Sequence, residues 1–199
     1  MDKKLKTLFS RVFGLYNRFG IKSVTMDDVA RELGISKKTL YQYVRDKSEL
    51  VEKVMIMNAL HHREALYEIV AQKHNAIDEL LAVNHYMNVM MKEQNPTIDY
   101  DLKKYYPEIH TKLMQDSRMR MYNAIRENLI KGQKEGLYRQ NMDVDIISKI
   151  HMARLEYKYT SDSFTINELS SDRVMKEIFH YHLHGIASVK GLKVLSEKL

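Results

Sequence analysis

Apolar side chains recur at helical spacing along most of the chain, and they define the first predicted element clearly. The spacing predicts a helix over residues 3–19 that ends at Gly20. Its single apolar face is formed by Leu5, Leu8, Phe9, Val12, Phe13, Tyr16 and Phe19. Because only one face is apolar, this helix is expected to pack against neighbouring helices rather than stand alone.

A second, short helix is predicted over residues 26–33. Thr25 is a suitable N-cap, and Asp28 stands three residues later, close to the capping-box arrangement. Gly34 follows the last apolar position, where a helix end favours a residue with positive φ. We expect Val29 and Ala30 on the buried face of this helix.

A third short helix is predicted over residues 37–43, with Ser36 as its N-cap and Leu40 facing inward. The positions left outside are Lys37, Lys38, Thr39, Tyr41 and Gln42. Two short helices joined by a three-residue connection with a glycine form a helix-turn-helix, whose second helix fits the major groove of DNA. An ordinary helical hairpin is the alternative.

The remainder of the chain also follows a helical pattern. Further helices are predicted over residues 47–72, 75–94, 107–134, 143–159 and 171–188, with Pro107 in a first turn and Asp143 as a cap. Residues 98–106 form a short aromatic segment, 136–139 a loop, 156–170 a mobile connection, and the residues after 188 a tail. The fold class is therefore all-α with about nine helices. We divide it into a DNA-binding domain of residues 1–47 and a larger helical domain of residues 48–199.

The amino-acid composition excludes several kinds of functional site. The 199 residues include 7 Gly, 2 Pro and no Cys, which excludes disulfides, thiolate nucleophiles and Cys-ligated metals. No stretch of about 18 apolar residues and no secretory signal is present. We expect a soluble, cytoplasmic protein without a membrane partner.

Charge is concentrated at the N-terminus. Residues 1–50 contain 11 Lys and Arg but 6 Asp and Glu, so that +5 of the net charge of +6 lies in the first quarter of the chain. A basic region on a small folded unit favours a polyanionic partner, with DNA or RNA ahead of an anionic membrane. A solvated basic surface is the alternative.

Residues 25–50, TMDDVARELGISKKTLYQYVRDKSEL, resemble the N-terminal DNA-binding domain of TetR-family transcriptional regulators. The matching elements are the VA–LGIS–TLY–Y core and the K-x-E-L start of the next helix. The resemblance implies that Thr25 and Lys47 bind phosphates, that Tyr43 adds a contact to the DNA backbone, and that the recognition surface consists of Ser36, Lys37, Lys38, Thr39 and Tyr41. Val44 departs from the family, which more often has Phe there.

The resemblance also implies a homodimer formed through the last two long helices. A single recognition helix reads too few base pairs for specificity, which a twofold dimer on a palindrome remedies. The candidate interface consists of Ile146, Ile147, Ile150, Leu155, Val174, Ile178, Phe179, Leu183, Ile186 and Ala187. Burial within one chain is the alternative for these residues.

Thirteen Met and thirteen Tyr suit an adaptable pocket, which the family places among its middle helices. The candidate ligand-binding residues are Met57, His61, Tyr86, Met90, Tyr105, Tyr106, His110, Met114, Met121 and His151. Plain core packing is the alternative for each of them. His110 and His151 are candidate polar anchors for a small-molecule ligand.

The chemistry-bearing residues do not form a recognisable catalytic set. Glu177 and His180 make one Glu-x-x-His pair, with His184 one turn further along, but a di-metal bundle needs that motif twice. The sequence therefore predicts no enzymatic activity, cofactor or metal. The leading hypothesis is a homodimeric, ligand-responsive repressor that binds a palindromic operator and is released by a small apolar or amphipathic ligand. A helical-bundle di-metal enzyme and a basic module that binds membranes or RNA are the alternatives.

Overall fold

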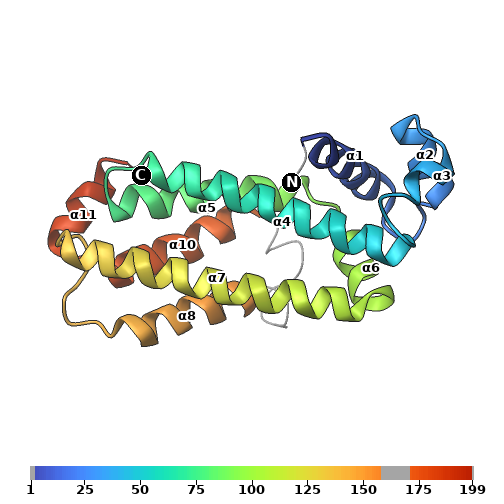
Figure 1. The fold of residues 1–199 in the computed structure, drawn as a ribbon. Coiled ribbons are helices and arrows are strands. Elements are labelled where there is room, and N and C mark those ends of the chain that lie inside the picture. The colour runs from blue at the N-terminus through green and yellow to red at the C-terminus, as the bar shows by residue number, and fades with distance from the viewer. Residues whose placement is uncertain (1–2, 158–170, 199) are drawn as a thin grey trace. The chain divides into compact units, whose positions relative to one another are not determined.

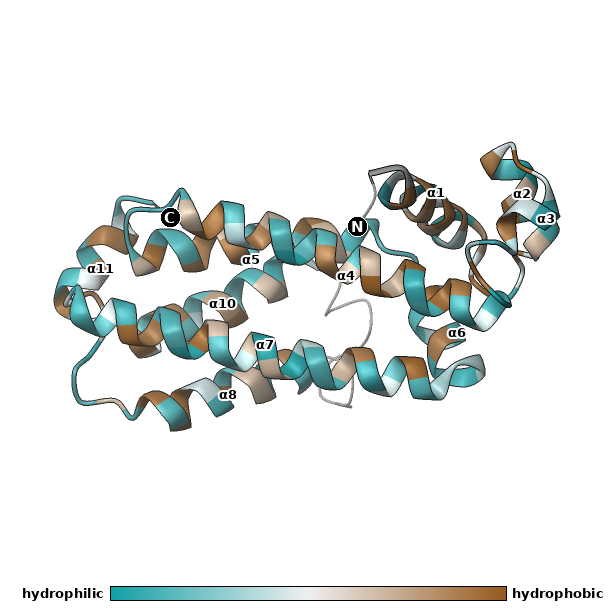
Figure 2. Cartoon of the chain, viewed as in Figure 1, coloured by the Kyte–Doolittle hydropathy of each residue, from teal (hydrophilic) through white to brown (hydrophobic). Residues whose placement is uncertain are grey.

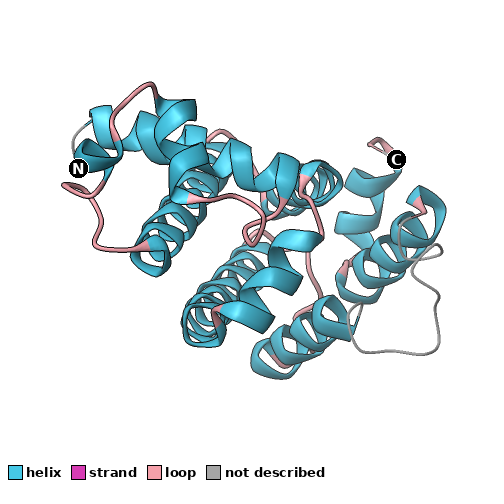
Figure 3. Cartoon of the chain, turned by 90° about the vertical axis from the view of Figure 1, so that its right-hand side faces the viewer, coloured by secondary structure: helices cyan, strands magenta, loops and turns pink. Residues whose placement is uncertain are grey.

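A computed structural model describes residues 3–157 and 171–198, and within these ranges the fold is all-α (Figures 1 and 3). The helices are α1 (Lys3–Phe19), α2 (Met26–Leu33), α3 (Lys37–Leu40), α4 (Lys47–Ala71), α5 (Ala76–Glu93), α6 (Thr97–Tyr105), α7 (Pro107–Lys134), α8 (Val144–Tyr157), α10 (Asp172–Ile186) and α11 (Val189–Ser196). One isolated bridge pairs Tyr138 with Ala187. The predicted fold class is confirmed.

The structure differs from the prediction at three places. α3 ends at Leu40 rather than at residue 43, because the next amides bond three residues back in a tight turn, as from the Tyr43 N–H to the Leu40 carbonyl at 3.0 Å. The aromatic segment after Pro96 is a helix, α6. The predicted tail contains α11, where Ser188 caps the helix and Leu195 is buried.

The predicted connection over residues 156–170 lies outside the described residues from position 158 onward. So does the predicted end of the preceding helix at residue 159. Asp143 caps α8 as expected, since its carboxylate accepts the N–H groups of Asp145 and Ile146 at 2.9 and 3.0 Å.

The chain divides into two compact units, each with its own core. The first unit comprises residues 1–71 and 84–116. Its core joins α1, α2, α3, the first turns of α4 and part of α6. The fully buried members include Val12, Tyr16, Leu40, Leu50, Val51, Val54 and Ile98. The helix-turn-helix is thus held on the start of α4, and the proposed domain boundary at residue 47 is the first residue of that helix.

The end of α1 is tied to the α5–α6 connection within this unit. The Asn95 N–H donates to Asn17 Oδ1 at 2.8 Å, and the Asn95 side-chain amide donates to the Asn17 carbonyl at 3.1 Å. Asp101 of α6 is buried, and its carboxylate accepts the Lys22 N–H at 2.8 Å. Because buried polar groups need partners, these bonds hold α6 on the loop that follows α1.

The second unit comprises residues 72–83 and 117–199. Tyr138 is buried against Gly132 of α7, and its hydroxyl donates to Asn128 Oδ1 at 3.0 Å. Part of the predicted dimer interface belongs to this intrachain core, namely Phe179, Leu183, Ile186 and Ala187. That assignment was wrong for these four residues, because α10 turns its most apolar face toward α7 and α11 residues of its own unit.

None of the described helices is long and apolar enough to cross a membrane. Figure 2 shows the physical reason, since hydrophilic and hydrophobic turns alternate along α4 and α7, the two longest helices.

Candidate nucleic-acid interface

The N-terminus of α2 is closed by a complete capping box. Thr25 has extended backbone angles and its Oγ1 accepts the Asp28 N–H at 3.2 Å, while the Thr25 N–H donates to Asp28 Oδ2 at 2.9 Å. The Thr25 hydroxyl also donates to Asp28 Oδ2 at 2.6 Å, and these bonds lower the pKa of the Asp28 carboxyl. The predicted N-cap is confirmed, and Thr25 is exposed at the start of the helix.

The turn between α2 and α3 depends on Gly34. This residue has φ of 68°, which side-chain-bearing residues rarely adopt, and its N–H donates to the Arg31 carbonyl at 3.1 Å. Ser36 then caps α3 by accepting the Thr39 N–H at 3.0 Å. Leu40 is fully buried below the helix. The helix-turn-helix inferred from the sequence is therefore present.

The outer face of α3 and its turn consists of hydrogen-bonding side chains. Lys37, Lys38, Tyr41 and Gln42 are exposed, and Thr39 is half-buried. Tyr41 is 44% exposed, so its side chain is accessible to a partner molecule. Gln42 belongs to this surface as well, although the family pattern did not single it out.

Lys37 and Lys38 differ in their ion pairs. The Lys37 ammonium lies 3.0 Å from Asp27 Oδ1 of α2, and that pairing raises the pKa of Lys37. Among the described residues no ion pair involves Lys38. Because both side chains of the Lys37 pair are at least half exposed, the pair is weak and exchangeable for a phosphate.

Lys47 begins α4 beside the α1–α2 loop. Its Nζ donates to the Lys22 carbonyl at 3.1 Å, and partial burial lowers the pKa of its ammonium. Glu49 N–H donates to the Asp46 carboxylate at 2.8 Å, so Asp46 caps the helix. Lys47 is thus positioned by a contact with the backbone of the α1–α2 loop.

The structure also brings together two lysines and a tyrosine of the first unit that the sequence did not connect. The Lys22 ammonium stands 4.8 Å from the centre of the Tyr105 ring, and Lys104 of α6 stands 5.4 Å from the same ring. Tyr105 was predicted to bind a ligand, yet it is 37% exposed between two lysines. Only the folding of α6 onto the α1–α2 loop reveals this arrangement, since Lys22 and Tyr105 are far apart in the sequence.

Comparison with known proteins agrees with this geometry. Residues 13–54 match the family model described as "Bacterial regulatory proteins, tetR family". A protein of Bacillus subtilis (strain 168), described as the uncharacterized HTH-type transcriptional regulator YvaF, is 24% identical over 189 residues, which are 94% of this chain and 96% of that protein. Residues 13–54 are therefore a DNA-binding domain of the TetR family. The chain is a DNA-binding transcriptional regulator.

Solved structures share the fold of this chain. A transcriptional regulator from Cytophaga hutchinsonii ATCC 33406 has a TM-score of 0.72 at 18% identity, covering 94% of this chain and all of that one. A regulator from Saccharomonospora viridis, solved in complex with choline, has a TM-score of 0.67 at 17% identity with the same coverage. At these identities the likeness concerns the fold alone.

The predicted ligand-binding residues of this regulator fall into separate groups. Met57 and Tyr106 pack against the core of the first unit. The Tyr86 hydroxyl lies 2.6 Å from His62 Nδ1, and the His61 and His62 rings are 5.8 Å apart. Sequence reasoning did not single out His62, because its contact with Tyr86 depends on the packing of α4 against α5.

The remaining candidates are scattered. Met90 is half-buried on α5, and Met114 is 45% exposed on α7. His110 Nε2 lies 3.2 Å from Asp99 Oδ1 near the surface. Met121 and His151 belong to the second unit, where His151 is buried. The proposed ligand set stays a prediction.

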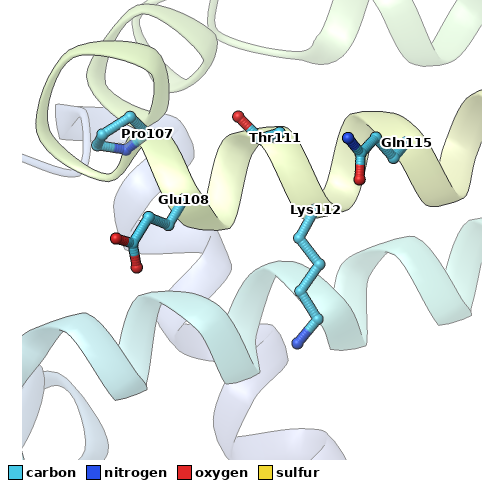
Figure 4. A pocket seen from close by; sticks show the side chains of 5 residues that line it. All are labelled: Pro107, Glu108, Thr111, Lys112 and Gln115. Carbon is cyan, nitrogen blue, oxygen red and sulfur yellow. The ribbon is translucent and has the colours of Figure 1, made fainter.

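A surface depression on α7 is lined by a different set of residues, shown in Figure 4: Pro107, Glu108, Thr111, Lys112 and Gln115. Lys112 also donates to Glu52 Oε1 of α4 at 2.9 Å. The depression is shallow and open to solvent, and it contains none of the predicted ligand-binding residues. It therefore does not resemble the enclosed cavity that buries most of a small organic ligand.

The histidine-based metal hypothesis gains no support from the geometry. His180 and His184 have ring centres 6.3 Å apart, and His184 Nδ1 is bonded to the His180 carbonyl at 2.8 Å. Within the described ranges, no three His, Asp or Glu side chains are grouped as metal ligands.

Proposed function

We propose that this regulator acts in the cytoplasm as a homodimeric repressor that binds a palindromic operator and is released by a small organic ligand. The observation that carries the proposal is the outward face of α3, where Lys37, Lys38 and Tyr41 project from a helix whose Leu40 is fully buried. Lysine and tyrosine donors of this kind contact guanine edges and phosphates in the major groove.

Thr25 and Lys47 supply the phosphate contacts on either side of α3 in this proposal. Thr25 lies at the positive end of the α2 dipole, which favours an anion. Ser36, Thr39 and Tyr43 complete the surface. Lys22 and Lys104, which flank Tyr105, extend its positive charge along the first unit.

The dimer interface is assigned to the exposed apolar residues of α8 and α10. Ile146 and Ile150 are each 55% exposed one turn apart on α8, and Tyr181 of α10 is 84% exposed. Isolated apolar side chains on a surface are common, but three large ones on two neighbouring helices favour association. A second copy of the chain would bury them. Binding a palindromic operator then requires the two copies of α3 to lie roughly 34 Å apart, the separation of successive major grooves.

Release by a ligand requires a movement of α4. The first turns of α4 belong to the core of the helix-turn-helix, and its later turns bear His61 and His62 facing Tyr86 of α5. A ligand whose binding is coupled to a separation of these residues would shift α4 and change the spacing of the two recognition helices. A preference of about 100-fold for the released conformation corresponds to about 2.7 kcal/mol.

The proposal is tested by gel-shift titration of the full chain on DNA upstream of its own gene at several salt concentrations. With about four phosphates contacted per subunit, the logarithm of the association constant should fall with the logarithm of salt concentration with a slope of about −7. Tyr41→Ala should weaken binding at least about tenfold, and Lys38→Gln should make the slope about 2 less steep in the dimer.

Lys134→Gln is the control, because Lys134 is an exposed cation on α7 in the second unit. It should leave both affinity and salt slope unchanged. Normal binding by the Tyr41 and Lys38 variants would mean that α3 is not the recognition helix.

A further inference from the structure

The second unit contains a group of three nitrogen-bearing side chains that the proposed function does not yet use. His151 and Arg154 lie one turn apart on α8, and His182 lies on α10. The rings of His151 and His182 are 4.0 Å apart between centres and meet edge to face at 73°. Both histidines are buried, so this cluster of His151, Arg154 and His182 forms an internal contact between the two helices.

The hydrogen bonds of the cluster leave donors unused. Arg154 Nη2 lies 2.9 Å from His151 Nε2, and because a guanidinium only donates, His151 Nε2 accepts and carries its proton on Nδ1. Arg154 Nε and His182 Nε2 are buried without a hydrogen-bond partner in the described part of the chain. Orphaned buried polar atoms are rare and indicate a missing partner.

The charge of the cluster is also uncompensated. No ion pair involves Arg154 among the described residues, and Glu156, two positions further along α8, is already paired with Arg118 of α7 at 2.7 Å. Burial lowers the pKa of Arg154 to about 10 and that of His182 to about 4. A guanidinium withdrawn from water without a counter-ion destabilises a fold unless an anion approaches it.

The chemistry of these groups selects an anion rather than a metal or a water molecule. A cation is repelled by Arg154, and His151 Nε2 already accepts a hydrogen bond from it. A water molecule would satisfy the orphaned nitrogens but would not neutralise the guanidinium. A carboxylate does both, since two oxygens match the planar donor fork of an arginine.

We propose that Arg154, His151 and His182 form the anionic end of the ligand site, which binds an organic acid through its carboxylate. This proposal rests on the proposed function, because it assigns a chemical class to the ligand of the regulator. Arg154 remains partly exposed, which gives a small molecule access to the cluster from solvent.

The test is thermal unfolding of the full chain at pH 7.5 with acetate, hexanoate and benzoate, each compared with its own amide and with inorganic phosphate. At about a hundredfold excess over the dissociation constant, at least one acid should raise Tm by about 5 °C or more in a saturable manner. Its amide should have no such effect. Equal effects of every acid and its amide, or stabilisation by phosphate alone, would overturn the assignment of an organic carboxylate.

Arg154→Met removes the charge but keeps the unbranched aliphatic part of the side chain. It should abolish the response to the acid and leave the Tm of the ligand-free chain unchanged or higher, because a buried charge without a partner has been removed. Arg154→Lys should weaken the response, since lysine lacks the planar fork. Lys149→Met, an exposed cation on the same helix, should respond like the original chain. A full response in Arg154→Met would overturn the proposal.

Gel-shift measurements on the same proteins separate this proposal from the proposed function. In one outcome the chain binds its operator normally, no acid changes that binding and no acid raises Tm. This outcome contradicts the carboxylate site alone. Failure of the chain to bind its operator while the acid still raises Tm contradicts the repressor function and leaves the carboxylate site supported.

Discussion

At the scale of single residues, the closest packing in the second unit joins Gly132 of α7 to the ring of Tyr138. A Cβ atom added at position 132 would overlap that ring. Tyr138 cannot move away easily, because it is 1% exposed and its hydroxyl is bonded to the Ala76 carbonyl and to Asn128 at 3.2 and 3.0 Å. Glycine is therefore required at position 132 for steric reasons and not because of its backbone angles.

We expect Gly132→Ala to reduce the free energy of unfolding by about 2 kcal/mol, because the added methyl group overpacks a closed core. The measurement is urea unfolding followed by circular dichroism. Gly14→Ala is the matched control, since Gly14 also lies inside a helix but has open space at its Cβ position. It should stabilise by up to about 1 kcal/mol, and equal losses in both variants would contradict the steric explanation.

At the scale of elements, α5 and α7 are joined by a partly buried ion pair. Glu79 is 7% exposed, accepts the Asn128 side-chain amide at 3.0 Å and pairs with the Lys131 ammonium. This pairing raises the pKa of Lys131. By contrast, Arg126 of α7 and Asp145 are paired at 2.8 Å with about half of each side chain in solvent.

We expect Lys131→Met to reduce the free energy of unfolding by about 2–3 kcal/mol, because it leaves Glu79 charged and buried. The loss is smaller than for a fully buried pair, since the Lys131 side chain is 35% exposed. Adding Glu79→Leu should recover most of the loss. The control Arg126→Met should cost less than about 1 kcal/mol. Chemical unfolding of the four proteins checks this, and a double variant less stable than Lys131→Met would refute the account.

At the scale of the whole molecule, the buried histidines make stability depend on pH. Burial lowers the pKa of His151 to about 2 and that of His182 to about 4, both with Arg154 beside them. Unfolded histidines bind protons near pH 6.5. Below that pH the unfolded chain takes up protons that the folded chain excludes, so stability is complete above about pH 6.5 and is lost as the pH falls toward these values.

We expect the free energy of unfolding to fall by about 2 kcal/mol per buried histidine between pH 7 and pH 5. His182→Gln should remove about that much of the difference, while the exposed His184→Gln should leave it unchanged. Urea unfolding at the two pH values provides the measurement. The same pH difference in His182→Gln and in the original chain would show that His182 is not responsible.

The sequence by itself determined the elements that depend on local chemistry. Thr25, Gly34 and Ser36 specify caps and a turn within a few residues of themselves, so the helix-turn-helix and its exposed lysines and Tyr41 were predictable. The end of α3 and the presence of α6 and α11 were not predictable. The helical patterns there are weak, so packing decides them, as the burial of Ile98 and Leu195 shows.

Only the tertiary structure decided which distant residues meet. Periodicity marks Phe179 and Leu183 as apolar but does not state whether the chain or a second copy covers them. Tyr105 beside Lys22, His62 beside Tyr86, and Arg154 between two histidines arise from contacts between helices. Local signals act over a few residues, whereas burial and charge pairing are set by neighbours that the chain brings together only when it folds.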